Sequence, residues 1–348
     1  MKLMEIKDLV RKNILEMKPY SSARDEFYKA NNEMIFLDAN ENPFENGLNR
    51  YPDSKQLALK LKIARQKGTT VEQITLGNGS DEILDLVFRV FCNPEKDNIV
   101  TLPPTYGMYG VLADLNGIEN REVLLNCDFQ LDIPKIMERI DANTKLIFIC
   151  SPNNPTGNLI CTEAIILLLK SFNGIVVIDE AYIDFAAQES WLKRGNEFPN
   201  LIVIQTFSKA YGMAGIRLGM AFASPFITSL LHKIKPPYNI STLTVNKGID
   251  QQESKNEIAL IKREKESLIK VLLKVDFVKK VYPSDANFVL IKVDNAVLRY
   301  NQLLENGIVV RNRSNYPNCK NCLRITIGTE AENQVLITVL NTIKKRES

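Results

Sequence analysis

A carboxylate and a lysine, each close behind an apolar run, are the residues of this sequence best placed to do chemistry. Asp179 follows Ile175–Ile178, and Lys209 comes shortly after Leu201–Gln205. A carboxylate at the end of a buried strand is costly unless a cation or a strong donor meets it. A lysine amine whose pKa is lowered by burial or by a neighbouring cation can act as a Schiff-base nucleophile. Taken singly, Asp179 could equally cap a helix or form an ion pair, and Lys209 could be a solvated surface side chain.

Two further stretches have the features of a phosphate site. Gly79 and Ser80 open an amphipathic helical pattern, and a glycine at a helix N-terminus leaves backbone N–H groups free to bind an anion. Arg217 follows Gly212 and Gly215, which permit close backbone approach, so its guanidinium could bind an anion through two hydrogen bonds. The simpler alternative for the first stretch is that Ser80 is an ordinary helix cap.

Two loops add an aromatic ring and side-chain amides. Tyr106, in Pro103–Gly107, could stack on a flat ring or pack as a core residue. Prolines and a glycine fix a tight turn at Ser151–Gly157, which presents two amides, one of them Asn154. With Ser208 near Arg217, these parts supply a phosphate cradle, a stacking ring, a buried acid and a reactive lysine. A pyridoxal phosphate site requires that set, because the acid keeps the ring nitrogen protonated as an electron sink.

The elements that must position these residues alternate between strand and helix. Continuous apolar runs indicate strands that are buried on both faces, and helical patterns lie between them. This order predicts an α/β fold with a mostly parallel sheet, in which ligands bind beyond the carboxyl ends of the strands. The predicted strands are Asn98–Leu102, Leu146–Cys150, Ile175–Asp179, Leu201–Gln205 and Gly219–Ala223, with helices that include Ser80–Cys92 and Thr162–Phe172.

The last quarter of the chain predicts a small α+β domain. A long charged helix is expected over about 252–275. Residues 1–30 are predicted to be a helical, polar segment that packs with this small domain, residues 31–255 a large cofactor-binding domain, and residues 256–348 the small domain. The shorter elements expected after the long helix are strands at Phe288–Lys292, Ile308–Arg311 and Leu323–Ile327 and helices at Ala296–Asn306 and Glu330–Lys345.

Composition narrows the class of protein. The 348 residues are 45% apolar and 24% charged with a net charge of +3, which is typical of a globular protein and leaves no nucleic-acid footprint. The charged N-terminus is unlike a signal peptide, no apolar run could span a bilayer, and six scattered cysteines indicate a reducing compartment, so a cytoplasmic protein is expected. Cys319 and Cys322 form a single C-x-x-C pair that cannot complete a zinc site with one histidine, so no metal is predicted. That histidine, His232, is expected on a helix surface without a catalytic role.

The same residues lie in strings that resemble the fold type I aminotransferases, a family of pyridoxal phosphate enzymes. The resemblance covers nearly the whole chain and is nearest to the histidinol-phosphate aminotransferases. It implies a large domain with a mostly parallel mixed sheet flanked by helices, followed by a small α+β domain. The strings that carry it are Pro19–Arg24, Asp38–Pro43, Arg50–Pro52, Pro103–Tyr109, Ser151–Gly157, Asp179–Phe185, Ser208–Arg217 and Leu323–Thr329.

The resemblance also implies roles at the ring of the cofactor. Lys209 would carry pyridoxal 5'-phosphate as a Schiff base and move the proton, and Asp179 would bind the pyridine nitrogen. Asn154 and Tyr182 would hydrogen-bond the phenolic oxygen, while Tyr106 would stack on the ring.

At the phosphate, the resemblance implies a ring of contacts that includes the partner subunit. Tyr51 would reach the phosphate of the other subunit, which implies a homodimer with shared sites. Arg324 would bind the substrate carboxylate and phosphate, assisted by Arg311 and Tyr20. The residues implied around the phosphate from the same chain are Gly79, Ser80, Asp81, Ser208 and Arg217.

The activity that follows is transfer of an amino group between L-histidinol phosphate and 2-oxoglutarate, a step of histidine biosynthesis. An aromatic or broad-specificity aminotransferase and a lyase similar to threonine-phosphate decarboxylase would keep the same cofactor residues. A non-enzymatic regulatory domain is a further alternative, although the chain has no spare length or basic block for a DNA-binding segment. The sequence departs from the family where Asp25, in place of a second basic residue, follows Arg24.

Overall fold

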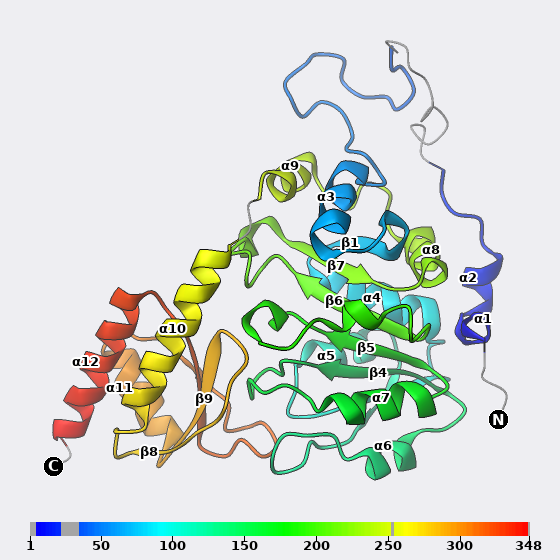
Figure 1. The fold of residues 1–348 in the computed structure, drawn as a ribbon. Coiled ribbons are helices and arrows are strands. Elements are labelled where there is room, and N and C mark those ends of the chain that lie inside the picture. The colour runs from blue at the N-terminus through cyan, green and yellow to red at the C-terminus, as the bar shows by residue number, and fades with distance from the viewer. Residues whose placement is uncertain (1–4, 22–34, 252–253, 347–348) are drawn as a thin grey trace.

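The large sheet of the molecule has seven strands, and all but one run in the same direction. The computed structural model describes residues 5–21, 35–251 and 254–346 (Figure 1). The strand order is β1-β7-β6-β5-β4-β2-β3, and only β7 is antiparallel to its neighbours. The expected mostly parallel mixed sheet is therefore confirmed. The strands are β1 (Ile74–Asn78), β2 (Asn98–Thr101), β3 (Glu119–Glu122), β4 (Thr144–Cys150), β5 (Ile175–Asp179), β6 (Leu201–Thr206) and β7 (Leu218–Phe222).

The central strands are apolar because both faces of the sheet are covered. In β5, Val176 and Ile178 belong to one hydrophobic core cluster, while Ile175 and Val177 belong to another on the opposite face. This alternation explains why continuous apolar runs predicted β2 and β4–β7 correctly. The remaining strands lacked that signal, since β1 has two polar residues and a glycine, and β3 is the polar edge strand ENRE.

Helices cover both faces of this sheet. Leu59 and Ile63 of α3 and Ile165 of α7 pack on one face, whereas Phe88 of α4 and Leu112 of α5 pack on the other. No helix in the described ranges is long and apolar enough to cross a membrane. The helices of this part are α3 (Leu57–Lys67), α4 (Ser80–Phe91), α5 (Met108–Leu115), α6 (Ile133–Arg139), α7 (Thr162–Ser171), α8 (Pro225–Ile234) and α9 (Thr242–Asp250).

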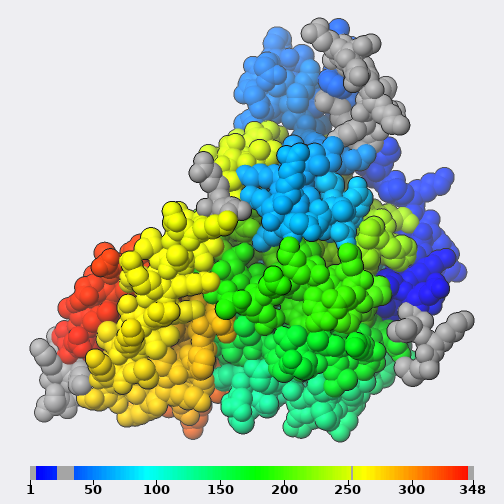
Figure 2. Space-filling view, viewed as in Figure 1, coloured from blue at the N-terminus to red at the C-terminus, as the bar shows by residue number. Residues whose placement is uncertain are grey.

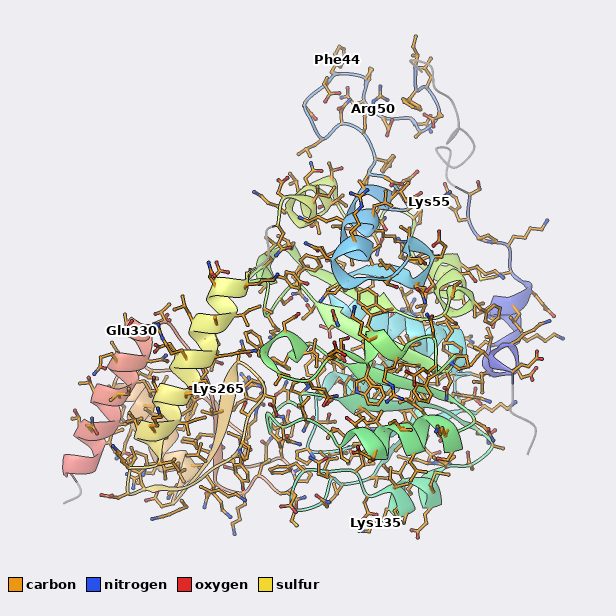
Figure 3. All side chains as sticks on the ribbon, in the orientation of Figure 1. Phe44, Arg50, Lys55, Lys135, Lys265 and Glu330 are labelled. Atoms are coloured by element: carbon orange, nitrogen blue, oxygen red, sulfur yellow. The ribbon has the colours of Figure 1, made fainter. Side chains whose placement is uncertain are left out.

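A smaller antiparallel sheet of order β10-β11-β9-β8 forms the C-terminal part (Figure 1). Its core joins Leu268 of α10, Val289 of β9 and Leu340 of α12. Lys265 of α10 donates to the carbonyls of Ser284 and Ala286 at 2.7 and 2.9 Å, which anchors α10 beside β9 (Figure 3). The elements are α10 (Lys255–Leu272), β8 (Val278–Val281), β9 (Phe288–Val293), α11 (Ala296–Glu305), β10 (Arg311–Asn312), β11 (Cys322–Thr326) and α12 (Glu330–Arg346).

The two sheets lie against each other, because Leu290 of β9 and Cys322 of β11 belong to the same core cluster as one face of the large sheet. The strand β8 was not among the predicted strands, and the strand predicted at Ile308–Arg311 is reduced to the two residues of β10. We propose that residues 31–255 form the large domain and residues 256–348 the small domain, since α10 begins at this boundary.

The described part of the N-terminal segment, residues 5–21, packs on the large domain, whereas the prediction placed the segment on the small domain. Leu9 and Ile14, in or beside α1 (Ile6–Leu9) and α2 (Lys12–Glu16), join the core cluster of the large domain. The amide of Arg11 donates to the carbonyl of Val90 at 3.0 Å. The segment lies there because these short helices bury their few apolar side chains against the end of α4. Residues 22–34, with the predicted departure at Arg24 and Asp25, lie outside the described residues.

Candidate active site

A cavity of about 260 Å³ lies beyond the carboxyl ends of β4, β5 and β6, facing β10 and β11 of the small sheet. The parallel register pairs Cys150 with Asp179 and Asp179 with Ile204, so the loops that follow these strands meet at one edge. The structure therefore brings together most of the predicted site residues. Those lining the cavity are Ser80, Asp81, Tyr106, Asn154, Asp179, Tyr182, Ser208, Lys209, Arg217, Arg311 and Arg324.

Asp179 is a buried acid held by two donors. Its side chain is 4% exposed, the hydroxyl of Tyr109 donates to Oδ2 at 2.9 Å, and the amide of Ala181 donates to Oδ1 at 3.0 Å. Burial raises the pKa of Asp179 to about 6. Within the part of the chain that the structure describes, no cationic side chain forms an ion pair with it. A cationic donor placed in the cavity would relieve this cost.

Tyr109 was not among the predicted site residues, although it fixes the orientation of the acid. It is fully buried in α5, and its ring stacks on Phe148 with centroids 4.9 Å apart. Tyr106 lies three residues earlier and packs edge-on against it at 5.6 Å. The i, i+3 spacing of the two tyrosines was the available signal, because it places both on one face of a helical turn.

Lys209 lines the cavity, and the pKa of its amine is lowered. Burial lowers the pKa of Lys209, and the nearby guanidiniums of Arg324 and Arg217 lower it further. Its Nζ lies 5.6 Å from the centroid of the Tyr182 ring. An amine in this setting is suited to nucleophilic attack on a carbonyl and to accepting a proton.

The N-terminus of α4 and Arg217 form a cradle for a phosphate. Gly79 precedes the helix with a φ of +81°, and a Cβ there would lie 2.7 Å from Nη2 of Arg217. A Cβ on Gly219 would lie 2.4 Å from the amide nitrogen of Ser80. No side chain in the described structure caps this helix, so Ser80 is not the cap. The N–H groups of the first turn are therefore available to an anion. Arg217 also donates to Oγ of Ser208 at 3.3 Å.

A wall of three guanidiniums faces Lys209 from the small sheet. Arg311 pairs with Arg324 in the β10–β11 register, and Arg324 donates to Oδ1 of Asn154. Burial and the charge of Arg313 lower the pKa of Arg324. The Nε atoms of Arg313 and Arg324 are buried without a partner among the described residues. Because no carboxylate among the described residues forms a salt bridge with these guanidiniums, they could bind an anion in the cavity.

Arg313 is the second site residue that the sequence-based prediction missed. It lines the cavity, and its guanidinium lies 5.1 Å from the ring centroid of Tyr316. The signal was the alternation of Arg311 and Arg313, since residues two apart in an extended segment point to the same side.

These features together fit pyridoxal phosphate. Asp179 is a buried carboxylate that lacks a cation, Lys209 has a lowered pKa, and α4 with Arg217 offers a phosphate cradle. Tyr106 lies at the same cavity, where its hydroxyl donates to Oδ1 of Asp81 at 3.1 Å.

Two predicted residues lie elsewhere in the chain. Tyr51 is 52% exposed and stacks on Tyr238 with ring centroids 4.5 Å apart, in a separate cavity of about 680 Å³. Tyr20 is 70% exposed and lines a third cavity beside Lys60. The roles expected of Tyr51 and Tyr20 therefore stay predictions.

The C-x-x-C pair lies inside the protein. Cys319 and Cys322 are buried free thiols in the core between the two sheets. Among the described residues, no group of three or more histidine, cysteine, aspartate or glutamate side chains is arranged to hold a metal ion.

Comparison with known proteins identifies the family. Residues 27–340 match the family model described as aminotransferase class I and II. The chain is a member of this family. It is 58% identical over 345 residues to a histidinol-phosphate aminotransferase of Flavobacterium johnsoniae, covering 98% of this chain and 99% of that protein.

Solved structures of the family share the fold. The crystal structure of the histidinol-phosphate aminotransferase of Clostridium acetobutylicum has a TM-score of 0.78 at 28% identity, covering 86% of this chain and 92% of that one. A decarboxylase of Sulfurospirillum multivorans has a TM-score of 0.75 at 27% identity, covering 86% of this chain and 80% of that one. The same fold therefore occurs in a protein named as an aminotransferase and in one named as a decarboxylase. The substrate of this chain must be argued from the site and from the high-identity relative.

Proposed function

We propose that this family member transfers an amino group between L-histidinol phosphate and 2-oxoglutarate, with pyridoxal 5'-phosphate as cofactor, in histidine biosynthesis. The observation that carries the proposal is the wall of Arg311, Arg313 and Arg324 facing Lys209. Each proposed substrate brings about two negative charges to the arginines, one through a phosphate and the other through two carboxylates. The 58% identity to a histidinol-phosphate aminotransferase over nearly the whole chain supports the same substrate pair.

In the proposed mechanism, bound pyridoxal phosphate supplies an electron-withdrawing ring that stabilises negative charge at the substrate α-carbon. Asp179 keeps the proton on the ring nitrogen, and the hydroxyl of Tyr109 holds that carboxylate in place. Lys209 would hold the cofactor covalently, and its Nζ, once free, would accept the α-proton of the substrate and donate it again. Its lowered pKa favours the neutral amine that this role needs.

The other lining residues orient the two reactants. Asn154 and Tyr182 line the same cavity as Lys209, and we propose that they hydrogen-bond the phenolic oxygen of the cofactor. The backbone N–H groups of Ser80 and Asp81, with Ser208 and Arg217, would bind its phosphate.

On the substrate side, we propose that the arginine wall serves both half-reactions. Arg324 would bind a carboxylate of 2-oxoglutarate and the phosphate of the donor in turn, and Arg311 and Arg313 would share these charges. Tyr20 is proposed to assist, reaching the substrate from a segment whose continuation lies outside the described residues.

A panel of amino donors tests this proposal. Purified, cofactor-loaded protein is assayed with 2-oxoglutarate and L-histidinol phosphate, phenylalanine, tyrosine or aspartate. L-Histidinol phosphate is expected to have the highest kcat/KM, because it alone brings a phosphate to the arginines. Equal or higher kcat/KM for an aromatic donor would reject the phosphate donor as the main substrate. Release of carbon dioxide from threonine phosphate, without amino transfer, would favour the lyase.

We also propose that the active unit is a homodimer with shared sites. Residues 35–51 stand clear of the body of the molecule (Figures 1 and 2). They expose large apolar side chains, among them Leu37 at 87% and Phe44 at 80%, and Phe44 lies at the tip (Figure 3). Exposed apolar surface of this extent favours burial against another chain. Tyr51 ends this segment, and from there it would reach the cofactor phosphate of a second copy.

Hybrid dimers distinguish a shared site from one built within a single chain. Lys209→Ala and Tyr51→Ala chains are each expected to be impaired alone. When they are mixed, one site in each hybrid regains both residues if Tyr51 serves the partner, and random pairing restores about a quarter of the activity. If Tyr51 serves its own chain, mixing restores nothing, and the shared-site proposal is wrong.

A further inference from the structure

The basic cavity beside Lys60, of about 310 Å³, lies at the β1 edge of the large sheet and shares no lining residue with the cavity that holds Lys209. Tyr20, which we proposed for the substrate side, lines this basic cavity in the present structure. Its walls come from α3, from α8 and the residues after it, from η2 (Val71–Gln73) and from the loop that holds Lys55 (Figure 3). The charged groups that line it are Lys55, Lys60, Lys233 and Lys235, with Glu72 as the acidic one. The residues lining this cavity therefore carry an excess of positive charge.

Lys60 is a buried lysine whose amine contacts an uncharged histidine. Its side chain is 3% exposed, and its Nζ lies 3.0 Å from Nε2 of His232. Burial lowers the pKa of His232 to about 3, and the ring is also hydrogen-bonded to the backbone of Ile74. His232 is thus a partly buried, uncharged acceptor for Lys60, and the expectation of a plain helix-surface role is wrong. Burial and the charge of Lys235 lower the pKa of Lys60 to about 7.

Lys235 is a second buried lysine whose partners are uncharged. It is 8% exposed and donates to Oδ1 of Asn239 at 2.7 Å, to Oε1 of Gln56 at 3.3 Å and to the carbonyl of Ser54 at 3.4 Å. Burial lowers the pKa of Lys235 to about 8.

The acidic groups near these lysines do not neutralise them. Glu72 is exposed at the rim, and Asp53 and Glu82 act on the lysines only from beyond ion-pair distance. Neither Lys60 nor Lys235 forms a salt bridge with a carboxylate in the described residues. Buried positive charge is costly unless it is paired, so a site with two such lysines and space beside them lacks an anion.

We propose that this cavity binds a small phosphoryl dianion, either inorganic phosphate or the phosphate group of a small metabolite. A dianion in the cavity would offset the charge of both buried ammonium groups, which a single carboxylate cannot match. Lys60, whose amine has His232 as its printed partner, would donate to the dianion directly. Lys235, whose three donors already meet Ser54, Gln56 and Asn239, would act through its charge. Its binding would raise the pKa of Lys60 and of Lys235, because a nearby opposite charge favours the protonated form. Binding should therefore take up protons near pH 8, where both lysines are partly neutral.

Calorimetric titration of the cofactor-loaded protein with inorganic phosphate tests this site. Titrations at pH 8 in two buffers of different ionisation enthalpy measure the protons taken up. The wild type and the control Lys170→Met, which removes an exposed lysine far from the cavity, should bind phosphate with proton uptake. Lys60→Met and Lys235→Met should weaken that event by more than about tenfold. Phosphate bound by the arginines of the active site contributes the same signal to the wild type and to every variant, because none of these substitutions lies in that cavity. The loss of affinity and of proton uptake in Lys60→Met and Lys235→Met therefore reports the basic cavity beside Lys60 alone.

Two further measurements keep the test decisive. Lys60→Met without phosphate should unfold at the same temperature as the wild type or higher, since it removes a buried charge, and it should lose the rise in Tm that phosphate gives the wild type. Tighter binding of glycerol 3-phosphate than of inorganic phosphate would identify a phosphorylated metabolite as the source. Phosphate affinity and proton uptake that are unchanged in Lys60→Met, or absent from the wild type, would overturn the proposal.

Discussion

Replacement of Asp179 by asparagine tests the electrostatic centre of the site. In the cofactor-free protein the buried carboxylate has a pKa of about 6, against an ordinary 3.8. That difference corresponds to about 3 kcal/mol of unfolding free energy. Because folding raises the pKa of Asp179, the protonated carboxyl favours the folded state. This contribution to the unfolding free energy is fully present below the unfolded pKa of 3.8 and is lost as the pH rises through about 6.

The asparagine variant should lack this pH dependence. Between about pH 4 and 6, cofactor-free wild type should lose up to about 3 kcal/mol that Asp179→Asn does not lose. Denaturant unfolding at several pH values measures the difference in slope. An offset that is the same at every pH is expected as well, because the amide of asparagine would face the two donors Tyr109 and Ala181.

The same variant should be nearly inactive once loaded with cofactor. Loss of one partner of a buried ion pair costs about 3–5 kcal/mol, which lowers kcat/KM by roughly 10²- to 10⁴-fold. Tyr109→Phe is the matched control, because it keeps the carboxylate and removes one hydrogen bond, so its activity should fall much less. The reasoning is refuted if Asp179→Asn binds cofactor and keeps kcat/KM within tenfold of wild type, or if its unfolding free energy follows the wild-type pH profile.

Three other substitutions examine separate parts of the site. Lys209→Ala should abolish transamination, and borohydride should no longer fix the cofactor to the chain in a mass spectrum; a reduced adduct would place the covalent link elsewhere. Gly79→Ala, with a Cβ 2.7 Å from Nη2 of Arg217 at a φ of +81°, should weaken cofactor binding by about tenfold in a fluorescence titration, and unchanged affinity would argue against the cradle. Arg313→Met should lower kcat/KM for L-histidinol phosphate by about 10- to 100-fold and leave that for phenylalanine nearly unchanged, whereas equal losses would assign Arg313 a structural role.

Much of the catalytic cavity could be predicted because its residues follow strands whose signal is local. The continuous apolar runs of β4, β5 and β6 mark strands that are buried on both faces. Parallel strands bring their carboxyl ends to one edge, so Asp179 and Lys209 had to lie near each other once the strands were recognised.

Other features could not be predicted from the local sequence alone. The edge strand β3 is polar, and β10 is two residues long, so neither has an apolar pattern to detect. The spacing of Tyr109 and Arg313 puts them close in sequence to predicted site residues. What each one contacts was not predictable, because the partner of Tyr109 is Asp179, in a different element of the fold. The packing of Leu9 and Ile14 on the large domain likewise depends on a surface formed by α4 and its neighbours.

The amino-acid sequence by itself determined the strand-helix alternation of the large domain and the family, and it singled out Lys209 as the predicted reactive lysine, since each depends on residues adjacent along the chain. Only the tertiary structure decided the electrostatic state of those groups. The raised pKa of Asp179, the lowered pKa of Lys209 and the uncompensated charge of Lys60 all result from burial and from charges contributed by distant segments. Burial is a property of the whole packed chain, because the distance from a side chain to water is set by elements far away in the sequence.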